Sequence, residues 1–170
     1  MVARLNLFGR MAVLLALLSA CTLDKEAELR AQLTDWVFLA QTRVFVSKMS
    51  CTAAVFDLVR PEISSKVERA KSIETALTRV RNGRPVLFDI PDLSPNEISQ
   101  QLMSKDLGKG LGMLSTGVGP AKECMEDEVA AGYYAVLMSP DTRTIYDPAG
   151  DALLMIYPPG NLAFFLRGNV

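Results

Sequence analysis

From residue 24 to residue 59, apolar side chains recur with the period of an α-helix. Placed at steps of 100°, they form two stripes on opposite sides of a helix, with narrow polar strips between them. The pattern predicts one long helix, which Pro61 ends because proline disfavours helical geometry in the residue before it. The first stripe comprises Leu29, Leu33, Trp36, Val37, Ala40, Val44, Cys51, Ala54, Val55 and Leu58, and the second comprises Phe38, Phe45, Met49 and Phe56.

A helix that is apolar on two sides is usually buried in the centre of a protein. The alternative is that one of its faces contacts a partner protein or a lipid. In that case Phe38, Phe45, Met49 and Phe56 are the candidate partner- or ligand-binding residues, because aromatic residues and methionine are enriched in interface cores.

Shorter elements are predicted after this helix. Residues 62–82 carry a single apolar stripe, which predicts a second helix with Gly83 as its C-cap. Residues 85–90 are typical of a short strand. Ser94 and Glu97 form a capping-box pattern with Pro95 in the first turn, so a helix is predicted from residue 95 to residue 105.

Glycine is frequent between residues 108 and 119, which predicts an irregular or loosely helical segment. Gly110 and Gly112 superficially suggest a nucleotide-binding loop. No strand precedes them directly, however, and the chain lacks the lysine-containing phosphate-loop motif. Close packing of backbones is the better interpretation of these glycines.

The C-terminal part of the chain is strand-like. Four apolar segments, 133–138, 142–146, 152–157 and 162–166, are separated by turn residues such as Pro, Asp, Gly and Asn. Their spacing predicts an antiparallel meander. The last two segments are apolar on both faces, so we expect them in mid-sheet with cover on each side. The predicted fold is α+β, with an N-terminal long helix and helical hairpin packed on a small C-terminal antiparallel sheet.

The first 20 residues have the pattern of a cleaved export signal. Arg4 and Arg10 precede an apolar run over residues 11–20. Ten residues span only about 15 Å as a helix, which is too short to cross a bilayer core of about 30 Å. The alternative is a short buried helix in a cytosolic protein, but the order of the basic and apolar parts favours the signal.

The end of this segment carries a more specific motif. Leu18, Ser19 and Ala20 place an aliphatic and two small residues directly before Cys21. In this motif the chain resembles bacterial lipoproteins, in which such a cysteine receives a diacylglycerol and becomes the first residue after cleavage. The resemblance covers the signal region alone. Thr22 follows, where members retained in the inner membrane usually have Asp, and this favours the outer membrane.

These features divide the chain into a cleaved signal peptide over residues 1–20, a lipidated N-terminus over 21–23 and one α+β domain over 24–170. Cys51 and Cys124 are the two cysteines that remain. In an oxidising compartment we expect them to form a disulfide; the alternative is two buried free thiols.

Composition limits the chemistry. The chain contains no histidine, which excludes Ser-His-Asp and Cys-His catalysis and histidine-based zinc or haem sites. Removal of Arg4 and Arg10 with the signal lowers the net charge from −1 to −3, which argues against nucleic acid as a partner. We expect no metal and no cofactor. The acidic residues Glu123, Glu126, Asp127 and Glu128 lack calcium-loop spacing, and Asp141, Asp147 and Asp151 lie in or beside predicted turns.

No catalytic group of residues is recognisable, so we do not expect an enzyme. We expect a lipoprotein of the cell envelope, attached to the membrane through Cys21 and facing the periplasm, that binds or supports a membrane-associated protein complex. One alternative is a carrier or sensor of an apolar ligand in the periplasm. Another is an enzyme whose chemistry uses no histidine.

Overall fold

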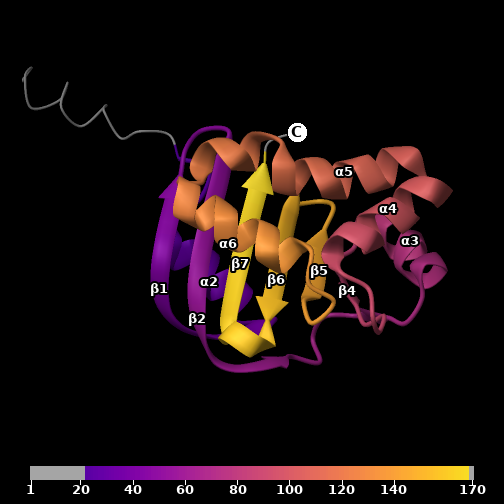
Figure 1. Ribbon diagram of the computed structural model, residues 1–170, viewed down its shortest axis with the longest axis horizontal. Helices are drawn as coiled ribbons and strands as arrows, with labels where there is room; N and C mark the ends of the chain where they lie inside the picture. The colour runs from indigo at the N-terminus through magenta and orange to yellow at the C-terminus, as the bar shows by residue number, and fades with distance from the viewer. Residues whose placement is uncertain (1–21, 169–170) are drawn as a thin grey trace, which may run out of the picture.

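The computed structural model describes residues 22–168, which form an α+β fold around a seven-stranded mixed sheet (Figure 1). The strand order is β1-β2-β7-β6-β5-β4-β3, and among these described strands only the β3–β4 pair is parallel. The strands are β1 (Val37–Ser47), β2 (Cys51–Ile63), β3 (Arg69–Ala70), β4 (Val86–Phe88), β5 (Arg143–Asp147), β6 (Ala152–Tyr157) and β7 (Leu162–Gly168).

Helices lie on both sides of this sheet. Besides the α-helices, the described chain has two short 3-10 helices, η1 (Pro120–Cys124) and η2 (Pro158–Gly160). Within residues 22–168, no helix is long and apolar enough to span a membrane. The α-helices are α2 (Glu26–Leu33), α3 (Ile73–Arg81), α4 (Pro95–Lys105), α5 (Leu107–Val118) and α6 (Asp127–Leu137).

The predicted long N-terminal helix is wrong. Helix α2 ends at Leu33, and most of the remaining segment forms the antiparallel hairpin of β1 and β2. Strand β2 is a central strand whose residues Cys51–Phe56 are all buried. A strand that is covered on both faces is apolar almost continuously. When such a run is placed at 100° steps, it also produces two stripes, so periodicity did not separate the two structures.

The predicted helical hairpin and the small sheet are wrong as well. The helix expected over 62–82 is reduced to α3, which Ser72 caps through a hydrogen bond from Thr75 N to its Oγ at 3.3 Å. Ile63 and Val67, which lie within the predicted helical segment, belong to a core on the other side of the sheet from Ile73. Segment 133–138, which was expected as a strand, lies mostly in α6. The sheet is therefore large, and its first two strands come from the N-terminal half.

Several local predictions are confirmed. Helix α4 begins at the predicted capping box, in which Glu97 N donates to Ser94 Oγ at 3.3 Å and Ser94 N donates to Glu97 Oε2 at 2.8 Å. Strand β4 lies within the expected segment 85–90. Strands β5, β6 and β7 form the expected antiparallel meander. Strands β6 and β7 lie in mid-sheet and bury residues on both faces.

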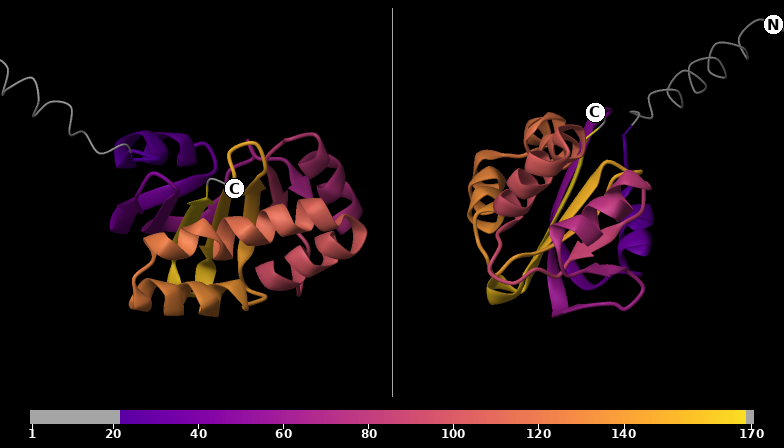
Figure 2. Two further views of the ribbon diagram at one scale, coloured as in Figure 1. Left: turned by 90° about the horizontal axis from the view of Figure 1, so that it is seen from above. Right: turned by 90° about the vertical axis from the view of Figure 1, so that its right-hand side faces the viewer.

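The sheet separates two apolar cores. Helices α5 and α6 cover one face, with α3 and α4 packed beside α5 near β4, whereas α2 lies on the other face (Figure 2). The core on the α2 side contains Leu29, Leu33, Phe56, Leu154 and Phe165. One helix of eight residues therefore covers much of that face, and a pocket opens beside it.

Candidate functional site

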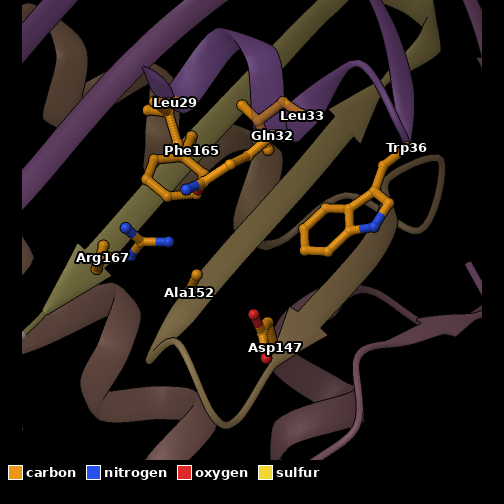
Figure 3. A pocket seen from close by; sticks show the side chains of 8 residues that line it. All are labelled: Leu29, Gln32, Leu33, Trp36, Asp147, Ala152, Phe165 and Arg167. Atoms are coloured by element: carbon orange, nitrogen blue, oxygen red, sulfur yellow. The ribbon is translucent and has the colours of Figure 1, made fainter. Parts of the chain in front are cut away.

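A pocket of about 320 Å³ opens between α2 and the β5–β6–β7 part of the sheet (Figure 3). Its size is at the lower end of the range for sites that hold small molecules. Its lining combines residues from both ends of the described chain: Leu29, Gln32, Leu33, Trp36, Asp147, Ala152, Phe165 and Arg167.

The pocket has apolar walls and a few polar groups. Leu29 and Leu33 belong to α2, and Phe165 belongs to β7. Arg167 and Asp147 lie on opposite sides of Ala152, as Figure 3 shows. Such a lining suits a molecule with an apolar body and one polar or charged end.

Arg167 connects this pocket with the start of the folded chain. Its guanidinium forms an ion pair with Asp24 and lies 5.3 Å from the centre of the Phe165 ring. The side chain of Asp24 is only 7% exposed and that of Arg167 20%. A buried ion pair is destabilising unless its geometry and its further hydrogen bonds offset the loss of hydration.

Two atoms of this pair lack such hydrogen bonds. Asp24 Oδ2 and Arg167 Nε are buried and have no partner among the described residues. Most buried polar atoms in proteins do have a partner. The pair therefore keeps unused hydrogen-bonding capacity beside the pocket.

Further contacts fix the first residues of the folded chain. Leu23 N donates to Lys48 O at 2.8 Å, and Asp24 N donates to Ser47 Oγ at 2.9 Å. Together with the ion pair to Arg167, these contacts join the entry of the chain to the β1–β2 turn and to β7. The chain is therefore held in place from Leu23 onwards.

The turn between β5 and β6 brings two carboxylates to this region. Burial and the nearby Asp147 raise the pKa of Asp151, and Arg167 partly opposes this rise. Asp147 Oδ1 accepts a hydrogen bond from Ala149 N at 3.2 Å, which is a turn-forming role. Asp151 lines a separate hollow of about 230 Å³, beside Gly150 and Arg167. The two acids thus line different hollows, and Asp141 lies in the turn before β5.

A second, more apolar groove of about 340 Å³ lies between α6 and the first strands. Val44, Val55, Val129, Leu162 and Phe164 line it. Charged residues at its rim are Arg43, Glu126 and Glu128.

The predicted disulfide is confirmed. Cys51 and Cys124 are bonded, with their Cα atoms 6.1 Å apart. The bond joins the start of β2 to the end of η1. Cys21, the predicted lipidation site, lies outside the described residues.

The four residues of the predicted second stripe do not share a helical face, because they lie in β1, in β2 and in the turn between them. Phe56 is fully buried, and Phe45 packs against the same core. Phe38 is half-buried, with the Arg60 guanidinium 3.7 Å from its ring centre. Met49 is 74% exposed at the tip of the turn.

Sequence reasoning missed the pocket. Gln32 and Trp36 lie more than 130 residues from Arg167 in the sequence, and no motif connects them.

The acidic residues Glu123, Glu126, Asp127 and Glu128 are all exposed. Within residues 22–168, no group of three or more His, Cys, Asp or Glu side chains is arranged to hold a metal ion.

Comparison with protein-family models, with curated proteins and with solved structures found no match. The function is therefore inferred from the residues and geometry of this chain.

Proposed function

We propose that the protein is a lipid-anchored, non-catalytic protein of the cell envelope that binds a protein partner at the membrane surface. The lipobox residues Leu18, Ser19 and Ala20 before Cys21 support the anchor. The disulfide between Cys51 and Cys124 suits the oxidising compartment that an exported protein enters. Thr22 after the cysteine favours the outer membrane over the inner.

The observation that carries the proposal is the short distance between Cys21 and the folded body. At 3.3–3.6 Å per residue, the Cα atoms of Cys21 and Leu23 are at most about 7 Å apart. Leu23 is already hydrogen-bonded to Lys48, and Asp24 is paired with Arg167. A lipid on Cys21 would therefore hold the domain at the bilayer surface, where it reaches only molecules that lie there too.

Binding fits the site better than catalysis does. The polar groups of the first pocket are Gln32, Asp147 and Arg167, and Arg167 is already paired with Asp24. These groups offer charge and hydrogen bonds to a bound molecule. A general acid–base mechanism would instead need proton-transfer groups that converge on one substrate.

The pocket beside α2 favours a second candidate function, which is the carriage or sensing of a small molecule with an apolar body. Its lining and the unused hydrogen-bonding atoms of Asp24 and Arg167 support this alternative. Organic extraction of the purified protein should then release a small molecule in stoichiometric amount. The variant Arg167→Met should lose that molecule, whereas Lys25→Met at an exposed site should retain it.

Mass spectrometry of the mature N-terminus tests the anchor. We expect an acylated Cys21 as the first residue, and the variant Cys21→Ser should leave the membrane fraction. An unmodified Cys21 or an intact Met1 would refute the anchor.

Photocrosslinking in intact cells tests the protein partner. A crosslinker that replaces Glu128, at the rim of the second groove beside α6, should give one product of defined mass. A crosslinker that replaces the exposed Gln101 on α4 is the control and should not give this product. The product should be lost with Cys21→Ser. If crosslinkers at Glu128 and at other exposed sites give no product while the anchor is intact, the partner proposal is wrong.

A further inference from the structure

Helix α5 carries an apolar stripe on its outer side. The stripe consists of Leu107, Leu111, Leu114 and Val118, spaced so that they share one helical face. Leu107 is 63% exposed and Leu111 is 46% exposed, while Leu114 and Val118 are half-buried. The buried residues of the same helix are Gly110, Met113, Thr116 and Gly117.

An outward apolar stripe is unusual for a helix on the surface of a domain. Such helices normally turn polar and charged residues towards water. Helix α5 contains one charged residue, Lys109, and no acidic residue. The stripe is therefore suited to an apolar or interfacial environment.

The stripe lies at the end of the molecule where the chain enters the folded body. Figure 1 shows α5 at the same end of the sheet as the β1–β2 turn, and Figure 2 shows this end from above. Bonds connect these parts. Leu23 N donates to Lys48 O, Lys48 Nζ donates to Glu123 O, and Cys124 is bonded to Cys51. Glu123 and Cys124 belong to η1, which directly follows α5.

Met49 adds a further apolar side chain to this end. It lies at the tip of the β1–β2 turn, next to Lys48, and is 74% exposed. Helix α5 extends the apolar surface sideways by about 18 Å, from its twelve residues at 1.5 Å each.

Three lysines at this end are available to pair with lipid phosphates, although the exposed acids Glu126, Asp127 and Glu128 follow η1. Lys48, Lys109 and Lys122 form no ion pair with a carboxylate of the described chain. Asp106, at the start of α5, is paired with Arg81. Glu123 is the exposed acid of η1. Lysines beside exposed apolar side chains are typical of surfaces that lie in the headgroup region.

We propose that Met49 and the α5 stripe form a membrane-contact surface that lies in the headgroup region of a bilayer. This inference rests on the proposed lipid anchor at Cys21. The anchor favours a bilayer over a protein as the surface that contacts these residues, because a lipid on Cys21 would hold Leu23 within about 7 Å of the lipidated residue. The end that carries Leu23 must then face the lipid, and Met49 and helix α5, with its exposed Leu107 and Leu111, lie at that end.

Quenching of tryptophan fluorescence by brominated lipids tests this surface in the lipidated protein, reconstituted in vesicles of phosphatidylcholine and phosphatidylglycerol. The chain has a single tryptophan, so Trp36→Phe provides a background without one. Leu111→Trp reports on the α5 stripe. Tyr134→Trp is the matched control, because Tyr134 is 44% exposed on α6, which Figure 1 shows further from that end of the sheet than α5.

We expect bromolipids to reduce the emission of Leu111→Trp by about twofold or more, as for a side chain in the headgroup region, and to leave Tyr134→Trp almost unchanged. Equal, weak quenching of both variants would overturn the inference. A blue-shifted Leu111→Trp emission without quenching, together with a dimeric mass, would assign the stripe to a second copy of the chain instead.

The same preparations separate this inference from the proposed anchor. Mass spectrometry shows whether Cys21 is acylated in each sample. If it is acylated and Leu111→Trp is not quenched, the contact surface is wrong and the anchor stands. If Cys21 is never acylated, both proposals fail.

Discussion

Asp24 and Arg167 form a buried ion pair that joins the start of the folded chain to its last strand, across 143 residues. Asp24 lies three residues after the predicted lipidation site, and Arg167 lines the pocket beside α2. The pair thus connects the start of the folded chain with the pocket beside α2. This connection leads to the first of five predictions.

Replacement of Arg167 by Met should destabilise the protein by about 2–4 kcal/mol, because it leaves the carboxylate of Asp24 buried without its partner. Urea denaturation measures the change. Lys25→Met provides the control, since Lys25 and Glu28 form an exposed pair and its loss should cost less than about 1 kcal/mol. Equal effects of the two substitutions would contradict a structural role for the buried pair.

Two glycines of α5 should respond in opposite directions to alanine. A Cβ on Gly110 would lie 2.3 Å from the backbone N of Met103 in α4, so Gly110→Ala should force the helices apart and destabilise the fold by about 1–3 kcal/mol or more. A Cβ on Gly108 would meet its nearest atom at 3.8 Å. Gly108→Ala should therefore stabilise the helix by up to about 1 kcal/mol. Thermal denaturation distinguishes the two, and equal melting temperatures would argue against close packing of α4 and α5.

Alanine substitutions of Phe56 and Met49 should have very different effects on stability, because one side chain is in the core and the other is on the surface. Phe56 is fully buried, so Phe56→Ala should cost about 3–5 kcal/mol of stability. Met49 is 74% exposed, so Met49→Ala should change stability by less than about 0.5 kcal/mol. Chemical denaturation of both variants provides the measurement. A large loss for Met49→Ala would show that the β1–β2 turn packs differently.

Reduction of the disulfide should destabilise the fold by about 4 kcal/mol on the chain-entropy model, because Cys51 and Cys124 are 73 residues apart. The comparison is between denaturation curves with and without a thiol reductant. The variant Cys51→Ala with Cys124→Ala should be insensitive to the reductant. If the reductant affects that variant as strongly as the native protein, the effect does not arise from this bond.

The raised pKa of Asp151 should make the stability of the protein depend on pH. Burial and Asp147 raise its pKa above the ordinary value of 3.8, so ionisation of Asp151 disfavours the folded state. The penalty is absent below the unfolded pKa, grows as the pH rises from there through the folded pKa, and is constant above it. Asp151→Asn should therefore raise the melting temperature at pH 7 relative to the native protein, and the gain should vanish near pH 3.

Asparagine also tolerates the positive φ of 45° at this position, so the substitution adds little backbone strain. Asp141→Asn in the neighbouring turn is the control. A gain for Asp151→Asn that is the same at both pH values would show that the charge of Asp151 is not its cause.

Local sequence signals determined several elements of this protein. The capping box of Ser94 and Glu97 specified the start of α4, because its hydrogen bonds form within four residues. Turn residues separated the strands of the β5–β6–β7 meander. The apolar character of β6 and β7 on both faces correctly predicted that these two strands lie in mid-sheet. An even pair of cysteines after a predicted export signal led to the prediction of the disulfide between Cys51 and Cys124.

The tertiary structure alone decided the rest. Segment 37–63 forms strands because β7 and β1 pair with β2 on its two sides and both faces of β2 are covered, and none of these contacts is local in sequence. The pocket exists because the ion pair between Asp24 and Arg167 and the packing of Leu29 and Leu33 bring α2 onto distant strands. Helix α5 ends near the β1–β2 turn because the disulfide and Lys48 connect η1, which follows α5, to that turn. Periodicity reports which residues avoid water, but only the packing partners determine whether a helix or a strand buries them.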